Sequence, residues 1–197
     1  MIPGQCVQSR HGAVIAMLFA TFLALTGCQA QPRPSESARA SLDELLILID
    51  QRLAVAPLVA RAKWNSRAPI DDPAREAQIL ADVTAQAQRA GVEPALAGAF
   101  FQSQFEAGKL IQCALHEQWR REGRPPFADA PDLARDVRPV LDALTPRLIA
   151  SLRAAQPLLA DSAARAYLVE RGAVVIRDDS GGAVRAEALR ALTAARR

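Results

Sequence analysis

Residues 41–64 read SLDELLILIDQRLAVAPLVARAKW, a sequence with the apolar spacing of a long helix. Ser41 and Glu44 have the spacing of a capping box, in which each side chain would satisfy a free backbone N–H at the start of a helix. Pro57 lacks a backbone N–H, but the apolar pattern resumes directly after it. We therefore expect one long first helix, from Leu42 to about Trp64, kinked at Pro57. The apolar residues that recur at helical spacing are Leu42, Leu45, Leu46, Ile49, Leu53 and Ala56.

The sequence on either side of this helix is also typical of helices. Asp72 followed by Pro73 predicts the start of a second helix that ends near Gly91. A third helix is expected from about residue 93 to 122, before a loop over residues 123–131. Residues 132–155 have a helical pattern interrupted by two prolines, and two short helices are expected over about 161–171 and 183–196. Residues 174–177 are compatible with a short strand, but the prediction is an all-α, multi-helix fold.

Composition supports this fold class and excludes several functions. The chain has 197 residues, which bounds it to one domain or at most two small ones. Half of the residues are hydrophobic and 41 are alanine, the best helix former, so an intrinsically disordered chain is excluded. The net charge of +3 is spread over mixed charges, unlike the dense basic surface that binds nucleic acid. We expect no nucleic-acid partner.

The first 27 residues have the pattern of an export signal. Arg10 and His11 precede an apolar run over residues 13–25, which is too short to span a bilayer. The run ends in Leu-Thr-Gly-Cys at residues 25–28, which resembles a lipoprotein signal box and would leave an acylated Cys28 attached to a membrane. Ordinary cleavage after Ala30 is the alternative. Either cleavage predicts a periplasmic or secreted protein.

The remaining chain divides into three parts by composition. Residues 29–40 are rich in proline and serine and are expected to be a flexible linker. Residues 41–155 form the expected helical core, and residues 156–197 a helical extension of the same domain. Cys113 is the only cysteine after residue 28, so we expect no disulfide and predict a buried, small apolar side chain there. His116 has no Cys or carboxylate at metal-ligand spacing, so no metal site is expected.

Two cations on the first predicted helix are candidates for a binding site. Arg52 and Lys63 are 11 residues apart, which is three turns plus about 20°, so both project from one face. The small apolar Ala56 and Val59 share that face. The chain has only two lysines, Lys63 and Lys109, whereas its other cations are arginines, so a lysine points to a chemical requirement. The structural alternative is that both cations extend their charge into solvent at the edge of the core.

Two further groups of polar residues have helical spacing. Asp72, Arg75 and Glu76 fall on the first turn of the second helix, where capping and helix-dipole interactions would also explain them. Gly108 and Gln112 lie four residues apart in the third helix, one turn after Gln104. A glycine inside a helix costs about 1 kcal/mol relative to alanine, so Gly108 suggests the close approach of a backbone or a ligand.

The order of these groups resembles the all-helical, AroQ-type chorismate mutases, specifically the exported γ subclass. The resemblance covers about residues 42–153 and is carried by five segments in the right order and spacing. They are Gln51-Arg52-Leu53, Ala62-Lys63-Trp64, Ile70-Asp71-Asp72-Pro73-Ala74-Arg75-Glu76, Phe100 to Gln112, and Trp119. The resemblance implies the Claisen rearrangement of chorismate to prephenate, a pericyclic reaction without cofactor or metal, and a homodimer.

The resemblance assigns a role to each matching residue. Arg52 would clamp a carboxylate of the substrate, which suits the planar guanidinium, and Arg75 would lie beside the reacting system. Lys63 would be shared between a carboxylate and the ether oxygen, on which negative charge grows as the bond breaks. Gln112 would donate a hydrogen bond to the same oxygen.

Three further residues would complete the substrate site. Glu76, with Asp72 beside it, would lie near the ring hydroxyl. In the exported subclass the last carboxylate-binding arginine comes from later in the same chain, and Arg147 is the candidate.

Gly108 departs from the family pattern, in which serine or threonine is common at this position. Glycine has no side-chain hydroxyl, so the site lacks about one hydrogen bond to a carboxylate, which contributes about 0.5 to 1.5 kcal/mol. We therefore expect a raised KM. Because of this departure, the sequence is also compatible with a catalytically inactive helical lipoprotein that binds an aromatic carboxylate or a protein partner. A purely structural periplasmic spacer is a further alternative.

Overall fold

The computed structural model describes residues 33–194, and within this range it is helical without a β-strand. The prediction of an all-α fold is confirmed. The predicted signal segment, Cys28 and residues 29–32 lie outside the described residues. The helices, in chain order, are α1 (Glu36–Leu53), α2 (Ala56–Ser66), α3 (Pro73–Arg89), α4 (Pro94–Arg121), the single-turn π-helix η1 (Leu133–Val137), α5 (Arg138–Ala155), the 3₁₀ helix η2 (Gln156–Ala160), α6 (Ser162–Val175) and α7 (Ala183–Thr193).

The first predicted helix is present as two helices, and it starts earlier than expected. Ser35 is the N-cap of α1, and its side chain accepts a hydrogen bond from the N–H of Ala38, so residues 36–40 of the predicted linker are helical. Ser41 lies inside α1 and donates to the carbonyl of Ser37 instead of capping the helix. The break falls at residues 54–55, and Pro57 lies in the first turn of α2, where a missing N–H costs nothing.

The second and third predicted helices agree with α3 and α4. Asp72 caps α3 by accepting a hydrogen bond from the N–H of Arg75 at 3.1 Å. Gly91 follows α3 with a φ of +82°, a conformation that favours glycine. Glu93 caps α4 by accepting from the N–H groups of Ala95 and Leu96.

The C-terminal part corrects two expectations. Pro146 does not interrupt the helix, because α5 runs through it from Arg138 to Ala155. Residues 174–177 do not form a strand: α6 extends to Val175, and Ile176, which ends the helix, has an extended backbone. The extension after residue 155 belongs to the same compact unit as the core.

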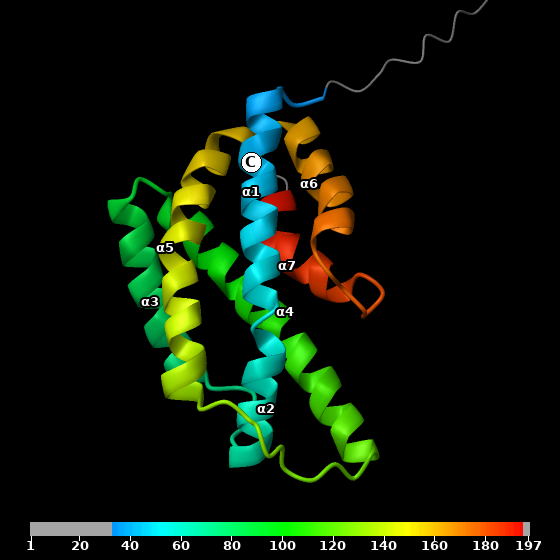
Figure 1. Ribbon diagram of the computed structural model, residues 1–197. Coiled ribbons are helices and arrows are strands. Elements are labelled where there is room, and N and C mark those ends of the chain that lie inside the picture. The colour runs from blue at the N-terminus through cyan, green and yellow to red at the C-terminus, as the bar shows by residue number, and fades with distance from the viewer. Residues whose placement is uncertain (1–32, 195–197) are drawn as a thin grey trace, which may run out of the picture. The chain divides into compact units, whose positions relative to one another are not determined.

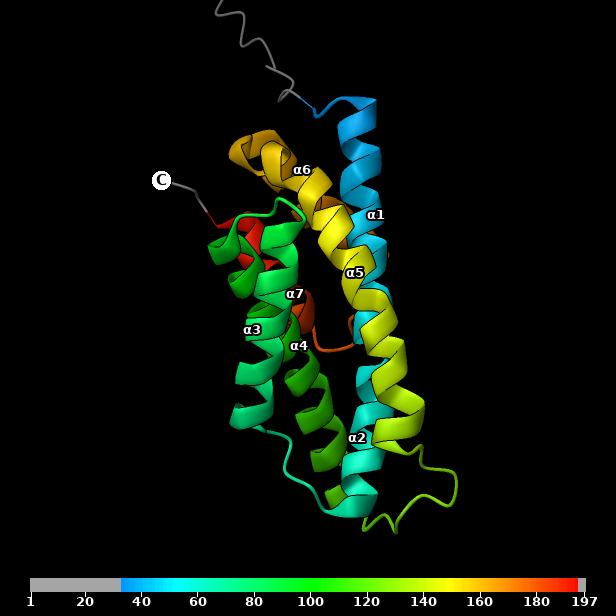
Figure 2. The ribbon, with the colours of Figure 1, turned by 90° about the vertical axis from the view of Figure 1, so that its left-hand side faces the viewer.

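The helices pack in two layers around α1 and α4 (Figures 1 and 2). Helix α1 contacts α5 and α6 in one layer, and α4 contacts α3 and α7 in the other. Helix α2 follows α1 in nearly the same direction and packs against α4. The core between the layers is aliphatic and aromatic, with Leu45, Leu46, Ile49, Phe100, Leu148 and Leu152 among its fully buried side chains. None of the helices over residues 33–194 is both long and apolar enough to span a membrane.

Candidate active site

A cavity of about 210 Å³ opens between α2, α3, α4 and α5, below the end of α1. Its wall is mostly apolar, with Phe101 and Phe105 contributed by α4 and Val55, Ala56 and Val59 by the α1–α2 junction. The polar and charged side chains that line it are Arg52, Lys63, Asp72, Arg75, Glu76, Gln104, Lys109, Gln112, Arg138, Asp142 and Thr145.

Residues that the sequence placed in three separate groups meet in this cavity. Seven of the eight candidate substrate residues line it, namely Arg52, Lys63, Asp72, Arg75, Glu76, Gly108 and Gln112. Arg147 does not. The break between α1 and α2 does not separate Arg52 from Lys63, because α2 follows α1 in nearly the same direction.

Arg52 is a cation held against the apolar wall. Its guanidinium carbon lies 5.5 Å from the centroid of the Phe105 ring, and its Nε is covered without a hydrogen-bond partner. No carboxylate within the described part of the chain forms an ion pair with Arg52. Burial lowers the pKa of Arg52 from its ordinary value to about 10. A charge in such surroundings is costly unless an anion pairs with it.

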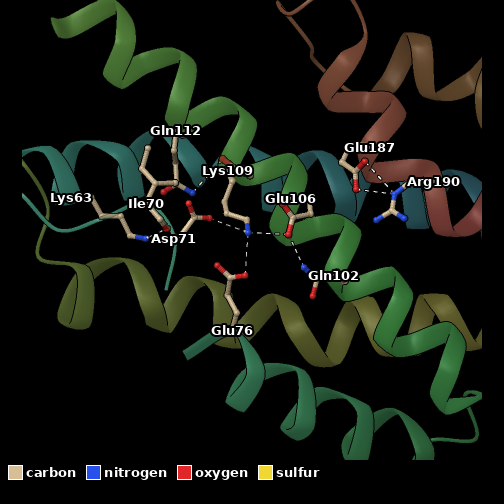
Figure 3. Close-up of polar contacts among 11 residues, drawn as sticks. Lys63, Ile70, Asp71, Glu76, Gln102, Glu106, Lys109, Gln112, Glu187 and Arg190 are labelled. Carbon is tan, nitrogen blue, oxygen red and sulfur yellow. Dashed lines mark hydrogen bonds and ion pairs between the residues drawn. The ribbon is translucent and has the colours of Figure 1, made fainter. Parts of the chain in front are cut away.

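Lys63 extends from α2 to the connection between α2 and α3. Its Nζ donates a hydrogen bond to the backbone carbonyl of Ile70 at 2.6 Å (Figure 3). Burial lowers the pKa of Lys63, while the carboxylates of Asp72, Glu76 and Asp71 oppose that effect. Lys63 therefore presents a partly desolvated ammonium at the cavity, held by a neutral carbonyl.

Gln112 offers a second hydrogen-bond donor on the α4 side. Its side chain is 7 % exposed, and its Nε2 donates to the carbonyl of Gly108, one turn earlier, at 3.2 Å. Its Oε1 is buried without a partner. A Cβ atom at Gly108 would meet only this Nε2, at 3.9 Å, so there is open space beside Gly108 for a small side chain.

The first turn of α3 contributes Asp72, Arg75 and Glu76. The capping explanation holds for Asp72, as described above. Arg75 is exposed at the rim of the cavity, where its Nη1 donates to Oε1 of Gln78 at 3.2 Å. Glu76 is 22 % exposed and forms an ion pair with Lys109, so dipole stabilisation alone does not account for it.

Helix α5 places a different arginine at the cavity from the one that was predicted. Arg147 is exposed: its Nη1 donates to Oε1 of Gln51 at 3.4 Å, and its Nη2 lies 4.0 Å from Oε1 of Glu44. Arg138 lines the cavity. The two arginines are nine residues apart, which at about 100° per residue places them on opposite sides of the helix.

Sequence reasoning also missed Lys109. Lys109 pairs with Glu106 at 2.9 Å, is 18 % exposed, lines the cavity and binds two other carboxylates as well. The scarcity of lysine was the available signal for a role at the site, because the chain has only two lysines and both line the cavity.

Cys113 and His116 lie on α4 outside the lining of this cavity. Cys113 is exposed, contrary to the prediction that it is buried, because it faces outward from α4. His116 contacts Trp64 edge to face and Trp119 in a tilted arrangement, and its Nε2 lies 2.8 Å from the carbonyl oxygen of Ala60. Within residues 33–194, no cluster of three His, Cys, Asp or Glu side chains could hold a metal ion.

The arrangement suits a small anion with more than one negative group. Cations come from three sides, with Arg52 and Lys63 from α1 and α2, Arg75 from α3, and Arg138 from α5. Between them lies an apolar surface large enough for one ring. Lys63 and Gln112 provide N–H donors, so the site can both hold a folded anion and stabilise negative charge that develops within it.

The chain is similar to known proteins in sequence and in fold. Residues 40–112 match the family model for chorismate mutase type II. The crystal structure of a chorismate mutase from Burkholderia thailandensis is 39% identical, with a TM-score of 0.69 over 78% of this chain and 99% of that one. A chorismate mutase from Burkholderia phymatum is 28% identical, with a TM-score of 0.67 over 80% and 99% of the two chains.

A secreted chorismate mutase from Mycolicibacterium smegmatis is 29% identical over 73% of this chain and 78% of that protein. The residues that the family model matches, 40–112, include Arg52, Lys63, Arg75 and Gln112, and the two crystal structures cover about four fifths of the chain. The chain therefore belongs to the chorismate mutase type II family and is an isomerase of that family.

Proposed function

We propose that this cavity binds chorismate in a folded conformation and rearranges it to prephenate. The observation that carries the proposal is Arg52, a guanidinium at an apolar cavity wall without a carboxylate partner in the described part of the chain. Chorismate is a dianion, so one of its carboxylates would supply the missing partner. The cost of burying Arg52 would then be recovered only when substrate is bound.

Two arginines are proposed to hold the two carboxylates of the substrate. Arg52 would bind one carboxylate deep in the cavity, and Arg138 would take the role that the sequence suggested for Arg147, because Arg138 is the arginine of α5 that lines the cavity. Arg75 would lie beside the reacting atoms at the rim. Clamping both ends of a flexible dianion restrains it near the geometry of reaction, which removes much of the entropic barrier.

Lys63 and Gln112 are proposed to stabilise the breaking bond. In the rearrangement the ether C–O bond breaks while a new C–C bond forms, and negative charge grows on the ether oxygen. Lys63 Nζ and Gln112 Nε2 each rest on a backbone carbonyl, of Ile70 and Gly108 respectively, at 2.6 and 3.2 Å. The ether oxygen would receive both donors, and preorganised donors of this kind act strongly in a water-poor site.

The acidic side chains have a separate proposed role. Glu76 accepts from Lys109 and lines the cavity beside Asp72. A carboxylate here would accept a hydrogen bond from the ring hydroxyl of chorismate and so orient the ring. A carboxylate at this position would also repel a substrate bound in the reverse orientation.

The test is the consumption of chorismate by the purified protein, followed optically, with Lys63→Ala and Arg52→Ala beside it. We expect Lys63→Ala to lower the rate at least a hundredfold, which corresponds to about 3 kcal/mol of transition-state stabilisation. Circular dichroism and Tm check that both variants are folded. A well-folded wild-type protein that does not exceed the uncatalysed rate would overturn the proposal.

One observation favours a second candidate function, a scaffold that binds an aromatic carboxylate without turnover. Gly108 leaves the cavity without the hydroxyl that is common in the family, and Gln112 folds back onto the Gly108 carbonyl. Such a protein would bind chorismate or prephenate in a calorimetric titration but would not convert chorismate faster than the uncatalysed background. Gly108→Ser would then leave it inactive, whereas an active enzyme would keep or gain affinity for its substrate.

We also propose that the protein is exported, on the basis of its first 27 residues and of the secreted relative from Mycolicibacterium smegmatis. We further propose that Cys28 is acylated and that the protein is a homodimer. The mass of the mature protein purified from membranes, compared with that of Cys28→Ser, tests acylation, and sedimentation equilibrium tests the dimer.

A further inference from the structure

Lys109 lies at the centre of a network of ion pairs on the wall of the cavity. Its Nζ is 2.9 Å from Oε1 of Glu106, 3.2 Å from Oε2 of Glu76 and 3.3 Å from Oδ1 of Asp71 (Figure 3). The three carboxylates come from three places: α4 itself, the first turn of α3, and the connection between α2 and α3. One ammonium therefore joins three segments that surround the site.

Two members of the network, Lys109 and Glu76, are more enclosed than an ordinary surface ion pair. Lys109 is 18 % exposed and Glu76 is 22 % exposed, whereas the ion pair between Arg121 and Glu117 on the same helix is 69 % and 62 % exposed. Glu106 is fixed in turn by Gln102, whose Nε2 donates to its Oε1 at 2.6 Å. Burial acts to lower the pKa of Lys109, but hydrogen bonds to Glu106, Glu76 and Asp71 raise it above its ordinary value.

The network also reaches Lys63 through the backbone. Lys63 donates to the carbonyl of Ile70, and Ile70 directly precedes Asp71, which pairs with Lys109. Asp71 is otherwise exposed on a connection between helices, so its pairing with α4 restrains the peptide that holds the Lys63 ammonium. With its charge engaged by three carboxylates, Lys109 is poorly suited to bind substrate itself.

We propose that Lys109 is a positioning residue that fixes Glu76 and the Ile70–Asp71 segment against α4 and thereby sets the place of the Lys63 ammonium in the cavity. The inference rests on the proposed function for its effect on turnover. It assigns a role to the second lysine of the chain: one lysine faces the reacting atoms, and the other holds the carboxylate and the carbonyl around it.

The kinetic test compares Lys109→Met, Lys109→Arg, Glu76→Gln and the double variant Lys109→Met/Glu76→Gln. Methionine keeps the apolar length of the side chain and removes the charge. We expect Lys109→Met to lower kcat/KM about tenfold with most of the loss in kcat, and Lys109→Arg to recover part of it. If Lys109 acts through Glu76, kcat/KM falls no further in the double variant than in Glu76→Gln alone, because the effects of substitutions within one network are not additive.

Arg121→Met is the matched control, because it removes a cation and an ion pair from the same helix away from the cavity. It should leave kcat/KM unchanged, and its Tm gives the baseline for losing a helical ion pair. A Lys109→Met variant that keeps the wild-type kcat/KM would overturn the inference. Losses that add in the double variant would overturn the part of the inference in which Lys109 acts through Glu76.

A spectroscopic test does not depend on turnover. Because the chain has only two lysines, protein labelled with ¹³Cε-lysine gives two side-chain signals, which Lys63→Ala assigns. At pH 7 we expect the Lys63 signal to shift in Lys109→Met and to stay in place in Arg121→Met. An unchanged Lys63 signal overturns the inference, whereas a shifted signal in a protein that does not turn over chorismate overturns only the proposed function.

Discussion

Arg138 and Arg147 lie on opposite sides of α5, with Arg138 at the cavity and Arg147 beside Gln51 and Glu44 on the outer surface. Each is an arginine near an apolar stretch of one helix, and the sequence alone favoured the wrong side. The distinction matters because only one of them can reach a ligand in the cavity.

We therefore expect Arg138→Ala and Arg147→Ala to differ sharply. Arg138→Ala should raise KM for chorismate roughly 10- to 100-fold, because a charge-assisted hydrogen bond contributes about 1.5 to 3 kcal/mol. Arg147→Ala should change KM less than twofold, since exposed ion pairs contribute little. Steady-state kinetics of the two variants decides the matter, and equal effects would contradict the assignment of Arg138.

Arg52 should lower the stability of the folded protein while it contributes to substrate binding. Its pKa is lowered to about 10 by burial, so the folded protein disfavours a charge that the unfolded chain carries freely, and this cost is fully present below about pH 10. Replacing it with methionine should raise the free energy of unfolding by about 1 kcal/mol and Tm by about 2–4 °C at pH 7, while abolishing turnover.

Two controls accompany Arg52→Met. The exposed Arg89 of α3, replaced in the same way, should change stability by less than about 0.5 kcal/mol. Prephenate or chorismate should raise the Tm of the wild-type protein but not that of Arg52→Met, because a ligand stabilises only the state that binds it. A lower Tm for Arg52→Met would show that its cation is stabilised within the protein.

Gly108→Ser should improve substrate affinity. A Cβ atom at this position meets no atom closer than Gln112 Nε2 at 3.9 Å, so the serine fits without displacing its surroundings. One added hydrogen bond to a carboxylate should lower KM roughly 2- to 10-fold. Gly98→Ser on the same helix, where the nearest atom is Thr84 Oγ1 at 3.7 Å, is the control: it gains the same helix propensity but should leave KM unchanged.

The pH profile should identify Gln112 as a donor. An amide donates at any pH, so the wild-type rate should not fall between pH 5 and 8 because of this residue. In Gln112→Glu the carboxyl must be protonated to donate, so kcat should fall as pH rises, by up to tenfold per unit once the pH exceeds the pKa of the new side chain. Measurement of kcat at intervals across this range compares the two proteins, and parallel profiles would argue against the role.

Local sequence signals predicted the elements whose ends have strong caps. Asp72-Pro73 and Glu93-Pro94 mark the starts of α3 and α4, and Gly91 follows the end of α3. The start of α1 was placed six residues late, at Ser41 instead of Ser35, because residues 36–40 are largely exposed and contribute no apolar periodicity. Pro146 shows the same limit, since a helix packed along α1 tolerates a proline that an isolated helix would not.

The candidate site was predictable where spacing along one helix determines which residues share a face. Arg52, Lys63 and Gln112 were identified in this way, together with the resemblance to a family. Lys109 was not, because its partners Asp71 and Glu76 lie more than 30 residues away and only packing of α3 on α4 brings them together. Cys113 shows that an apolar residue type does not fix burial when its helix face is turned outward.

The cavity has a consequence for mixtures of variants. Its lining comes from helices of a single chain, with Arg52 from the first helix and Arg138 from α5. Whatever its assembly, each chain then carries a whole set of functional groups, and two defective chains cannot lend each other the missing one. Arg52→Ala and Arg138→Ala, refolded together, should show no intersubunit complementation: the activity of the mixture should equal the mean of the two separate samples.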